Sequence, residues 1–85
     1  MTKKQMMQAI IDEYFSACDI WWSNTKLAKD DYLSENMRAI CKRDASESME
    51  SAHAIERILI KIEPNTDWFD EWCIYSYNKE HEITC

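Results

Sequence analysis

The chain has 85 residues, of which 46% are hydrophobic and 31% are charged, and its formal net charge is −6. This composition predicts one globular domain, residues 1–85, and argues against intrinsic disorder. Glycine is absent and Pro64 is the only proline. A many-stranded sheet with tight hairpin turns is therefore disfavoured, and the composition favours helices.

The start of the chain does not have the pattern of a secretory signal. Lys3 and Lys4 are followed at once by an amphipathic pattern that carries Asp12 and Glu13. No apolar run approaches the roughly 20 residues of a membrane-spanning helix. We therefore expect a cytoplasmic protein, in the cytosol of the host cell, where its four cysteines would be free thiols.

Residues 3–23 have the period of an amphipathic helix. Its apolar face is formed by Met7, Ile10, Ile11, Tyr14, Cys18 and Trp21. Trp21 and Trp22 are adjacent, so they point about 100° apart. Either the two indoles clamp the next helix between them, or one indole stays on the surface as an anchor for a partner, because Trp is enriched at interface hot spots.

A short polar connection follows, in which Ser23, Asn24 and Thr25 are turn formers. Asp30 or Asp31 is suited to cap the next helix, since a carboxylate accepts hydrogen bonds from free backbone N–H groups. Because the connection is short, we expect the two helices to lie antiparallel.

Residues 31–62 form the central element, with apolar side chains at helical spacing and the firmest core segment at its Ile-rich end. The apolar stripe is interrupted, because Asp44 lies in its centre and Ser48 and Ser51 project towards it. Either the helix breaks there, with Asp44 and Glu47 as a capping box, or it continues and presents this polar stretch to solvent or to a partner. The absence of Gly and Pro favours the continuous helix.

Pro64 ends the long helix, because proline biases the preceding residue away from the helical region. Asn65 or Thr66 then caps a third helix over residues 66–78. Residues 72–77 also suit a strand, but a hairpin with the end of the chain would be only marginally stable. The expected fold class is all-α: a small antiparallel three-helix bundle with a long central helix.

Negative charge is concentrated near the C-terminus. Residues 1–62 hold nine Lys or Arg and ten Asp or Glu, whereas residues 63–85 hold one Lys and six Asp or Glu. Large aromatic residues alternate with these acids, and such a surface can steer a basic partner by charge and contact it with rings. The candidate partner-binding residues are Asp67, Trp68, Asp70, Glu71, Trp72 and Trp22. The simpler interpretation is an amphipathic helix with Trp68 and Trp72 in the core and the acids in water.

Metal-binding and catalytic patterns are weak. Cys73, His81 and Cys85 are possible zinc ligands, but the chain lacks a close C-x-x-C pair. A Cys73 nucleophile beside His81 and Glu82 would lack a glycine-rich turn or oxyanion hole. We therefore expect no metal, no cofactor and no enzymatic activity.

The sequence favours a non-enzymatic, acidic protein-binding module that inhibits or modulates a larger, basic-surfaced protein that handles nucleic acid. Net negative charge without a basic stripe argues against direct binding of nucleic acid. Small acidic inhibitors from phages and mobile elements, anti-CRISPR proteins among them, have this character, an analogy of size and charge only. The alternative is a homo-oligomer that binds or sequesters a small ligand between protomers, using the polar stretch at residues 44–53.

Overall fold

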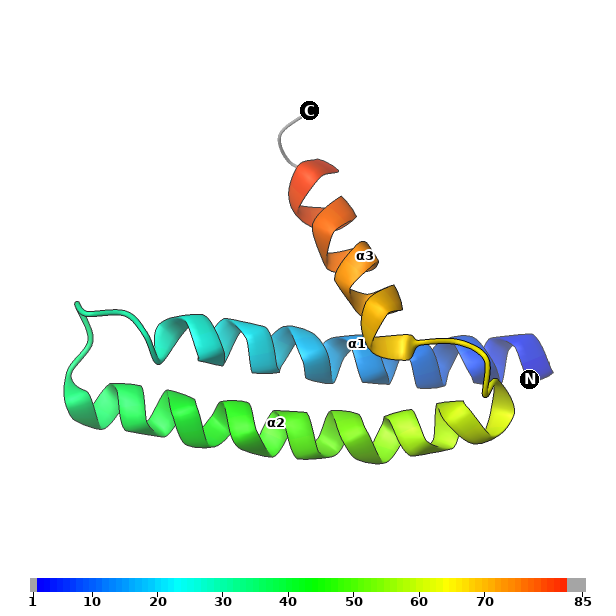
Figure 1. Cartoon of the computed structure of the whole chain (residues 1–85), viewed down its shortest axis with the longest axis horizontal. Helices are drawn as coiled ribbons and strands as arrows, with labels where there is room; N and C mark the ends of the chain where they lie inside the picture. The colour runs from blue at the N-terminus through cyan, green and yellow to red at the C-terminus, as the bar shows by residue number, and fades with distance from the viewer. Residues whose placement is uncertain (1, 83–85) are drawn as a thin grey trace.

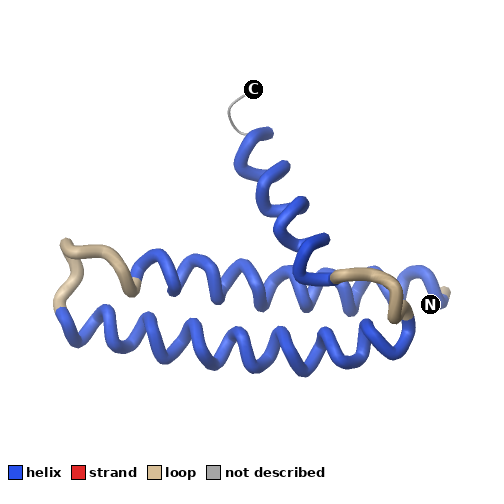
Figure 2. Tube along the Cα trace, viewed as in Figure 1, coloured by secondary structure: helices blue, strands red, loops and turns tan. Residues whose placement is uncertain are grey.

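The computed structural model describes residues 2–82, and this part of the chain contains three α-helices and no strand (Figures 1 and 2). They are α1 (Lys3–Leu27), α2 (Glu35–Ile62) and α3 (Trp68–Glu82). The first two lie side by side and antiparallel, as expected, and α3 leaves this hairpin steeply (Figure 1). The all-α class, the three helices and the long central helix are thus confirmed, and α3 crosses α1 instead of running along it.

Helix α1 begins with a capping box and ends later than predicted. Thr2 Oγ1 accepts a hydrogen bond from the backbone N of Gln5 at 3.2 Å, and the Gln5 side chain accepts one from Thr2 N at 2.9 Å. The predicted end at Ser23 is wrong because the next polar residues continue the helix. Asn24 Nδ2 and Thr25 Oγ1 each donate to the carbonyl four residues back, at 3.1 and 2.7 Å.

Helix α2 begins at Glu35, and its cap is Ser34, whose Oγ accepts from the backbone N of Met37 at 3.2 Å. The two predicted caps both lie in the preceding connection. Asp30 closes a turn there, since its carboxylate accepts from the backbone N of the residue two positions on, at 2.9 Å. Asp31 also lies outside the helix.

Helix α3 begins two residues later than predicted, at Trp68. Its first turn is capped by Asp67, whose Oδ1 accepts from Asp70 N at 3.1 Å, so neither Asn65 nor Thr66 fills the role that the sequence suggested. The helix continues to Glu82, so residues 72–82 are helical and do not form a hairpin. Residues 83–85 lie outside the described part of the chain.

Helix α2 is continuous through its polar stretch, so a break near Asp44 is ruled out. The face that packs on α1 consists of residues spaced alternately four and three apart: Cys41, Ala45, Ser48, Ala52, Ile55 and Leu59. This is the heptad spacing of a coiled-coil seam. Asp44 lies beside the seam, not in it, and its Oδ1 is 3.8 Å from Arg43 Nε. The placement of Asp44 in the centre of the apolar stripe is therefore wrong, because the seam passes through Ala45.

The same spacing recurs on α1, and the two seams meet in a single antiparallel register. Tyr14 bonds Glu56 across the hairpin, and two hollows between the helices are lined by Met7 with Ile62 and by Thr25 with Ala45. The core cluster is formed by Tyr14, Cys18, Ala52, Leu59, Trp68 and Trp72. The Ile-rich end of α2 contributes less than predicted, because only Leu59 is fully buried there while Ile58 and Ile60 are exposed.

Close approach of α1 and α2 depends on small seam residues, which gives a direct test. Ala52 is fully buried, so Ala52→Leu should lower the free energy of unfolding by about 1–3 kcal/mol through overpacking. Ala54 is exposed on the same helix, and Ala54→Leu should leave stability nearly unchanged. Urea unfolding of both variants measures the difference; equal losses would contradict the seam.

Candidate functional site

Two tryptophans fix how α3 is rotated about its axis. Trp68 and Trp72 are four residues apart, so they share one face of the helix, and they are only 8% and 4% exposed. Trp72 Nε1 donates a hydrogen bond to Asp19 Oδ1 on α1 at 2.9 Å. Trp68 Nε1 is buried with no acceptor among the described residues. The predicted partner contacts at these two indoles therefore do not form a surface, and the core interpretation applies to them.

Aromatic rings complete the contact of α3 with α1. Trp21 meets Trp72 edge-on at 5.9 Å between ring centroids and Phe69 at 6.0 Å, while Tyr75 lies 4.8 Å from Phe15. Such pairs stabilise by about 0.5–1.5 kcal/mol each beyond the burial of their area. A short row of rings and one buried hydrogen bond thus hold α3.

The adjacent tryptophans of α1 do not clamp α2 as one interpretation predicted. Trp21 packs against α3, as described above, and lies 5.8 Å from Trp22. Trp22 remains exposed, with Lys26 Nζ 5.5 Å from the centre of its ring. The surface position of Trp22 agrees with the second interpretation, and its role in partner binding stays a prediction.

The predicted acidic residues are exposed at the start of α3. Asp67, Asp70 and Glu71 all lie in or beside its first turn, away from the two buried tryptophans. The pKa of the Cys73 thiol is raised, first by burial and then by the negative charges of Asp70 and Asp67. Asp67, Asp70 and Glu71 are thus exposed together around the first turn of α3, and we name these three residues the acidic face.

Two residues on the outward side of α3, Ile74 and Tyr77, were not among the partner-binding residues predicted from the sequence. With Trp68 and Trp72 inside, helical geometry places Asp70, Ile74 and Tyr77 on the opposite side, and all three are exposed. A helical wheel centred on the tryptophans would have found them. The ion pair of Asp19 with Lys79, at 3.7 Å, had no local signal, because its members are 60 positions apart in the chain (79 minus 19).

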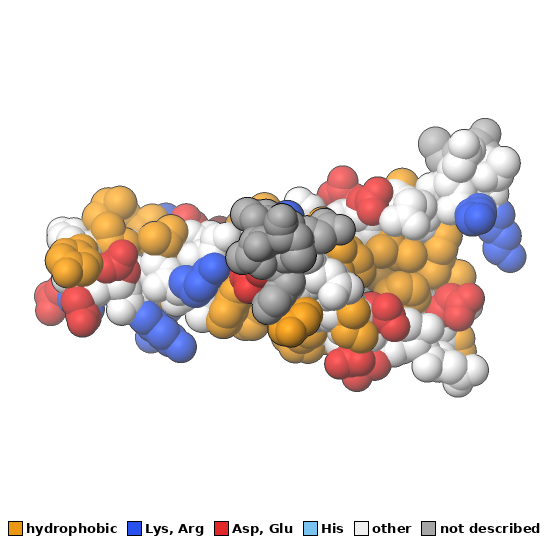
Figure 3. Space-filling model, turned by 90° about the horizontal axis from the view of Figure 1, so that it is seen from above, with side chains coloured by type: hydrophobic (Ala, Val, Ile, Leu, Met, Phe, Trp, Pro, Cys, Tyr) orange, Lys and Arg blue, Asp and Glu red, His pale blue; other side chains and the backbone are white. Residues whose placement is uncertain are grey.

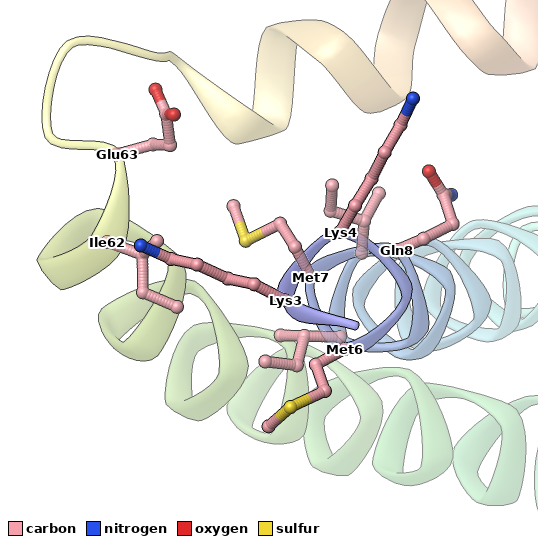
Figure 4. A pocket seen from close by; sticks show the side chains of 9 residues that line it. Lys3, Lys4, Met6, Met7, Gln8, Ile62 and Glu63 are labelled. Atoms are coloured by element: carbon pink, nitrogen blue, oxygen red, sulfur yellow. The ribbon is translucent and has the colours of Figure 1, made fainter. Parts of the chain in front are cut away.

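A second feature is an apolar groove of about 690 Å³ beside the start of α1. Its apolar lining comes from Met6, Met7, Ile10, Ile11 and Ile62. Figure 4 shows Met7 pointing into the space between α1 and the α2–α3 connection, with Lys3 and Lys4 on the α1 side and Glu63 on the other. Figure 3 shows hydrophobic side chains gathered at this end of the molecule with charged ones at the margin. We name this the N-terminal groove.

One group of titratable side chains lies in the core. Tyr14 Oη donates to Glu56 Oε2 at 3.1 Å, and burial is the main cause that raises the pKa of Tyr14. Burial also raises the pKa of the Cys18 thiol to about 11, and the charges of Asp19 and Glu56 act in the same direction while a hydrogen bond with Tyr14 opposes them. A thiol with a raised pKa is a poor nucleophile at neutral pH. The hydrogen bond between Tyr14 and Glu56 joins α1 to α2.

The polar stretch at residues 44–53 is divided between two environments. Ala45 and Ala52 face α1 in the seam, whereas Glu47, Glu50 and His53 are exposed. Ala45 also lines a hollow of about 300 Å³ between the two helices of the hairpin. Ligand binding between protomers at this stretch stays a prediction.

Residues 2–82 bring together no group of three His, Cys, Asp or Glu that could hold a metal ion; the His81 side chain and Cys85 lie outside the described part. Within the same range, no helix is both long and apolar enough to cross a bilayer. No protein-family model, no curated protein and no solved structure matches the chain.

The Asp19–Trp72 hydrogen bond can be tested with two substitutions at one position. Asp19→Ala leaves the buried indole N–H of Trp72 without an acceptor, so the free energy of unfolding should fall by about 1–3 kcal/mol. Asp19→Asn keeps an acceptor and loses only the ion pair with Lys79, which contributes less than about 1 kcal/mol because Lys79 is more than half exposed. Urea unfolding compares the two; equal destabilisation would show that this hydrogen bond does not anchor α3.

Proposed function

We propose that this chain is a non-enzymatic protein-binding module that docks its acidic face on a basic surface of a larger protein. The partner proposed is a nucleic-acid-handling protein of the cytosol, and the module inhibits or modulates it by occupying the surface that would contact phosphates. The observation that carries the proposal is the inward rotation of Trp68 and Trp72, which leaves Asp67, Asp70 and Glu71 exposed together on one turn.

Charge and rigidity both support this assignment. The C-terminal part, residues 63–85, carries one Lys against six Asp or Glu, whereas the hairpin is nearly neutral. A localised negative potential of this kind steers association with a positive surface and favours it over neutral ones. The acids stand on a helix that is capped and anchored on α1, so little entropy is lost in ordering them on binding.

The role of a nucleic-acid mimic follows from the same chemistry. A surface that binds phosphates presents Lys and Arg side chains, and carboxylates on a fixed helix can pair with these side chains. Exposed Trp22 adds a ring on which a partner guanidinium can stack. Duplex DNA and this chain should then compete for one surface of the partner.

The test uses a variant that removes charge and keeps the cap: Asp67→Asn, Asp70→Asn and Glu71→Gln combined. Asparagine is also a good N-cap residue, so α3 should remain folded. Immobilised wild type should capture basic proteins from a cell lysate, and the variant should lose them. Captured proteins should be released by added duplex DNA and by rising salt, because the contacts are ionic.

A charge-matched control separates local from global charge. Glu13→Gln, Glu47→Gln and Glu50→Gln combined remove three exposed carboxylates from the hairpin and should leave capture unchanged. If both triple variants lose the same proteins, only the overall charge matters. If neither loses them, or DNA does not compete, the proposed function is wrong.

A further inference from the structure

The chain exposes more surface than a compact monomer of its size. Its accessible surface is 6559 Å², whereas monomeric proteins of this mass expose about 5,300 Å². The radius of gyration is 14.9 Å, compared with about 12 Å for a compact domain of this length. The excess of about 1,200 Å² is larger than the area of about 800 Å² that each partner buries in a stable interface.

Part of the excess lies on the outward side of α3. Ile74 is 50% exposed and Tyr77 is also exposed, and Asp70 precedes Ile74 by one turn. We name Asp70, Ile74 and Tyr77 the outer stripe. Asp70 and Ile74 lie on the side of α3 opposite Trp68 and Trp72. Tyr77 lies at the edge of the stripe, beside a hollow that Trp21 and Trp22 of α1 also line.

The N-terminal groove has the complementary chemistry. Its lining is aliphatic and thioether side chains, and Met6 is 53% exposed there. Methionine adapts its shape readily to an incoming surface. Lys3 and Lys4 stand at the rim, where they can pair with a carboxylate that accompanies an apolar helix.

We propose that two copies of this chain form a twofold dimer in which the outer stripe of each α3 occupies the N-terminal groove of the other. Ile74 and Tyr77 enter the apolar groove, and Asp70 lies against Lys3 and Lys4 of the second copy. Each copy supplies one stripe and one groove, and the twofold axis that we propose makes the two contacts identical and closes the assembly. This dimer does not depend on a basic partner.

Asp70 belongs to both the outer stripe and the acidic face, so the two associations compete for it, and their response to salt distinguishes them. Each chain carries a net charge of −6, so two copies repel one another overall, and salt screens that repulsion. Burial of apolar surface supplies the attraction. The dimer should therefore persist in high salt, under conditions that release a basic partner from the acidic face.

The test measures the dimer dissociation constant of the purified full chain by sedimentation equilibrium over a concentration series. Ile74→Asp should weaken dimerisation about tenfold or more, because it places a charge in the apolar contact. The matched control is Ile20→Asp, since Ile20 is 49% exposed and lies on α1 outside both surfaces.

A second pair tests the groove. Met6→Asp should weaken dimerisation to a similar degree, whereas Met37→Asp, at a residue that is 49% exposed at the other end of the hairpin, should not. All four positions are exposed in the single chain, so the variants should keep the helical circular dichroism of the wild type.

Mixing the variants identifies the reciprocal arrangement. A Met6→Asp copy keeps its stripe and an Ile74→Asp copy keeps its groove, so their mixture contains one intact contact and should associate more tightly than either variant alone. A wild type that is monomeric at every concentration would overturn the proposal. It would also be overturned if either control weakened the dimer as much as its matched variant, or if mixing gave no gain.

Discussion

The rotation of α3 about its axis is the constraint on which the other features depend. Trp72 is buried against Trp21 and donates its indole N–H to Asp19, and Trp68 lies one turn earlier on the same side. Because a helix turns by 100° per residue, fixing these two side chains also fixes the direction of every other one. The acidic face and the outer stripe are exposed for that reason alone. No separate interaction is needed to orient them.

The hairpin and α3 are stabilised in different ways. α1 and α2 meet along a continuous heptad seam in which Ala45 and Ala52 permit close approach. The contact of α3 with the hairpin is short and depends on rings, one hydrogen bond and the ion pair of Asp19 with Lys79. Local opening should therefore begin at α3, because the element with the fewest buried contacts has the lowest opening free energy. The surface that we propose for partner binding is thus carried by the least stable element.

Sequence reasoning predicted the fold class, the antiparallel hairpin and the end of α2 before Pro64, because these follow from periodicity and from residues with a strong local effect. It misplaced the start of α2, since Asp30 and Asp31 were the predicted caps and Ser34 caps the helix; this choice depends on the geometry of the connection. It also placed Asp44 in the α2 stripe where Ala45 lies, because the small apolar residues in this part of the helix give a weak pattern.

The candidate site was predictable in part. Charge counting alone located Asp67, Asp70 and Glu71, and their exposure agrees with it. The indoles of Trp68 and Trp72 were counted as surface contacts because composition does not tell which side of α3 faces α1. The side of α3 that faces α1 is set by the contacts of Trp72 with Asp19 and Trp21, which are about 50 positions away in the chain. The N-terminal groove likewise joins the start of α1 to the end of α2, so no local window of sequence contains it.

The most direct measurement of this account is solvent exchange of the tryptophan indole N–H protons by nuclear magnetic resonance. The Trp72 proton is buried and bonded to a carboxylate, whereas Trp22 is exposed, so the two provide an internal comparison. We predict that the indole N–H proton of Trp72 exchanges with solvent much more slowly than the indole N–H proton of Trp22. Exchange at the same rate for both would show that α3 is not held in this rotation, and the acidic face and the outer stripe would lose their basis.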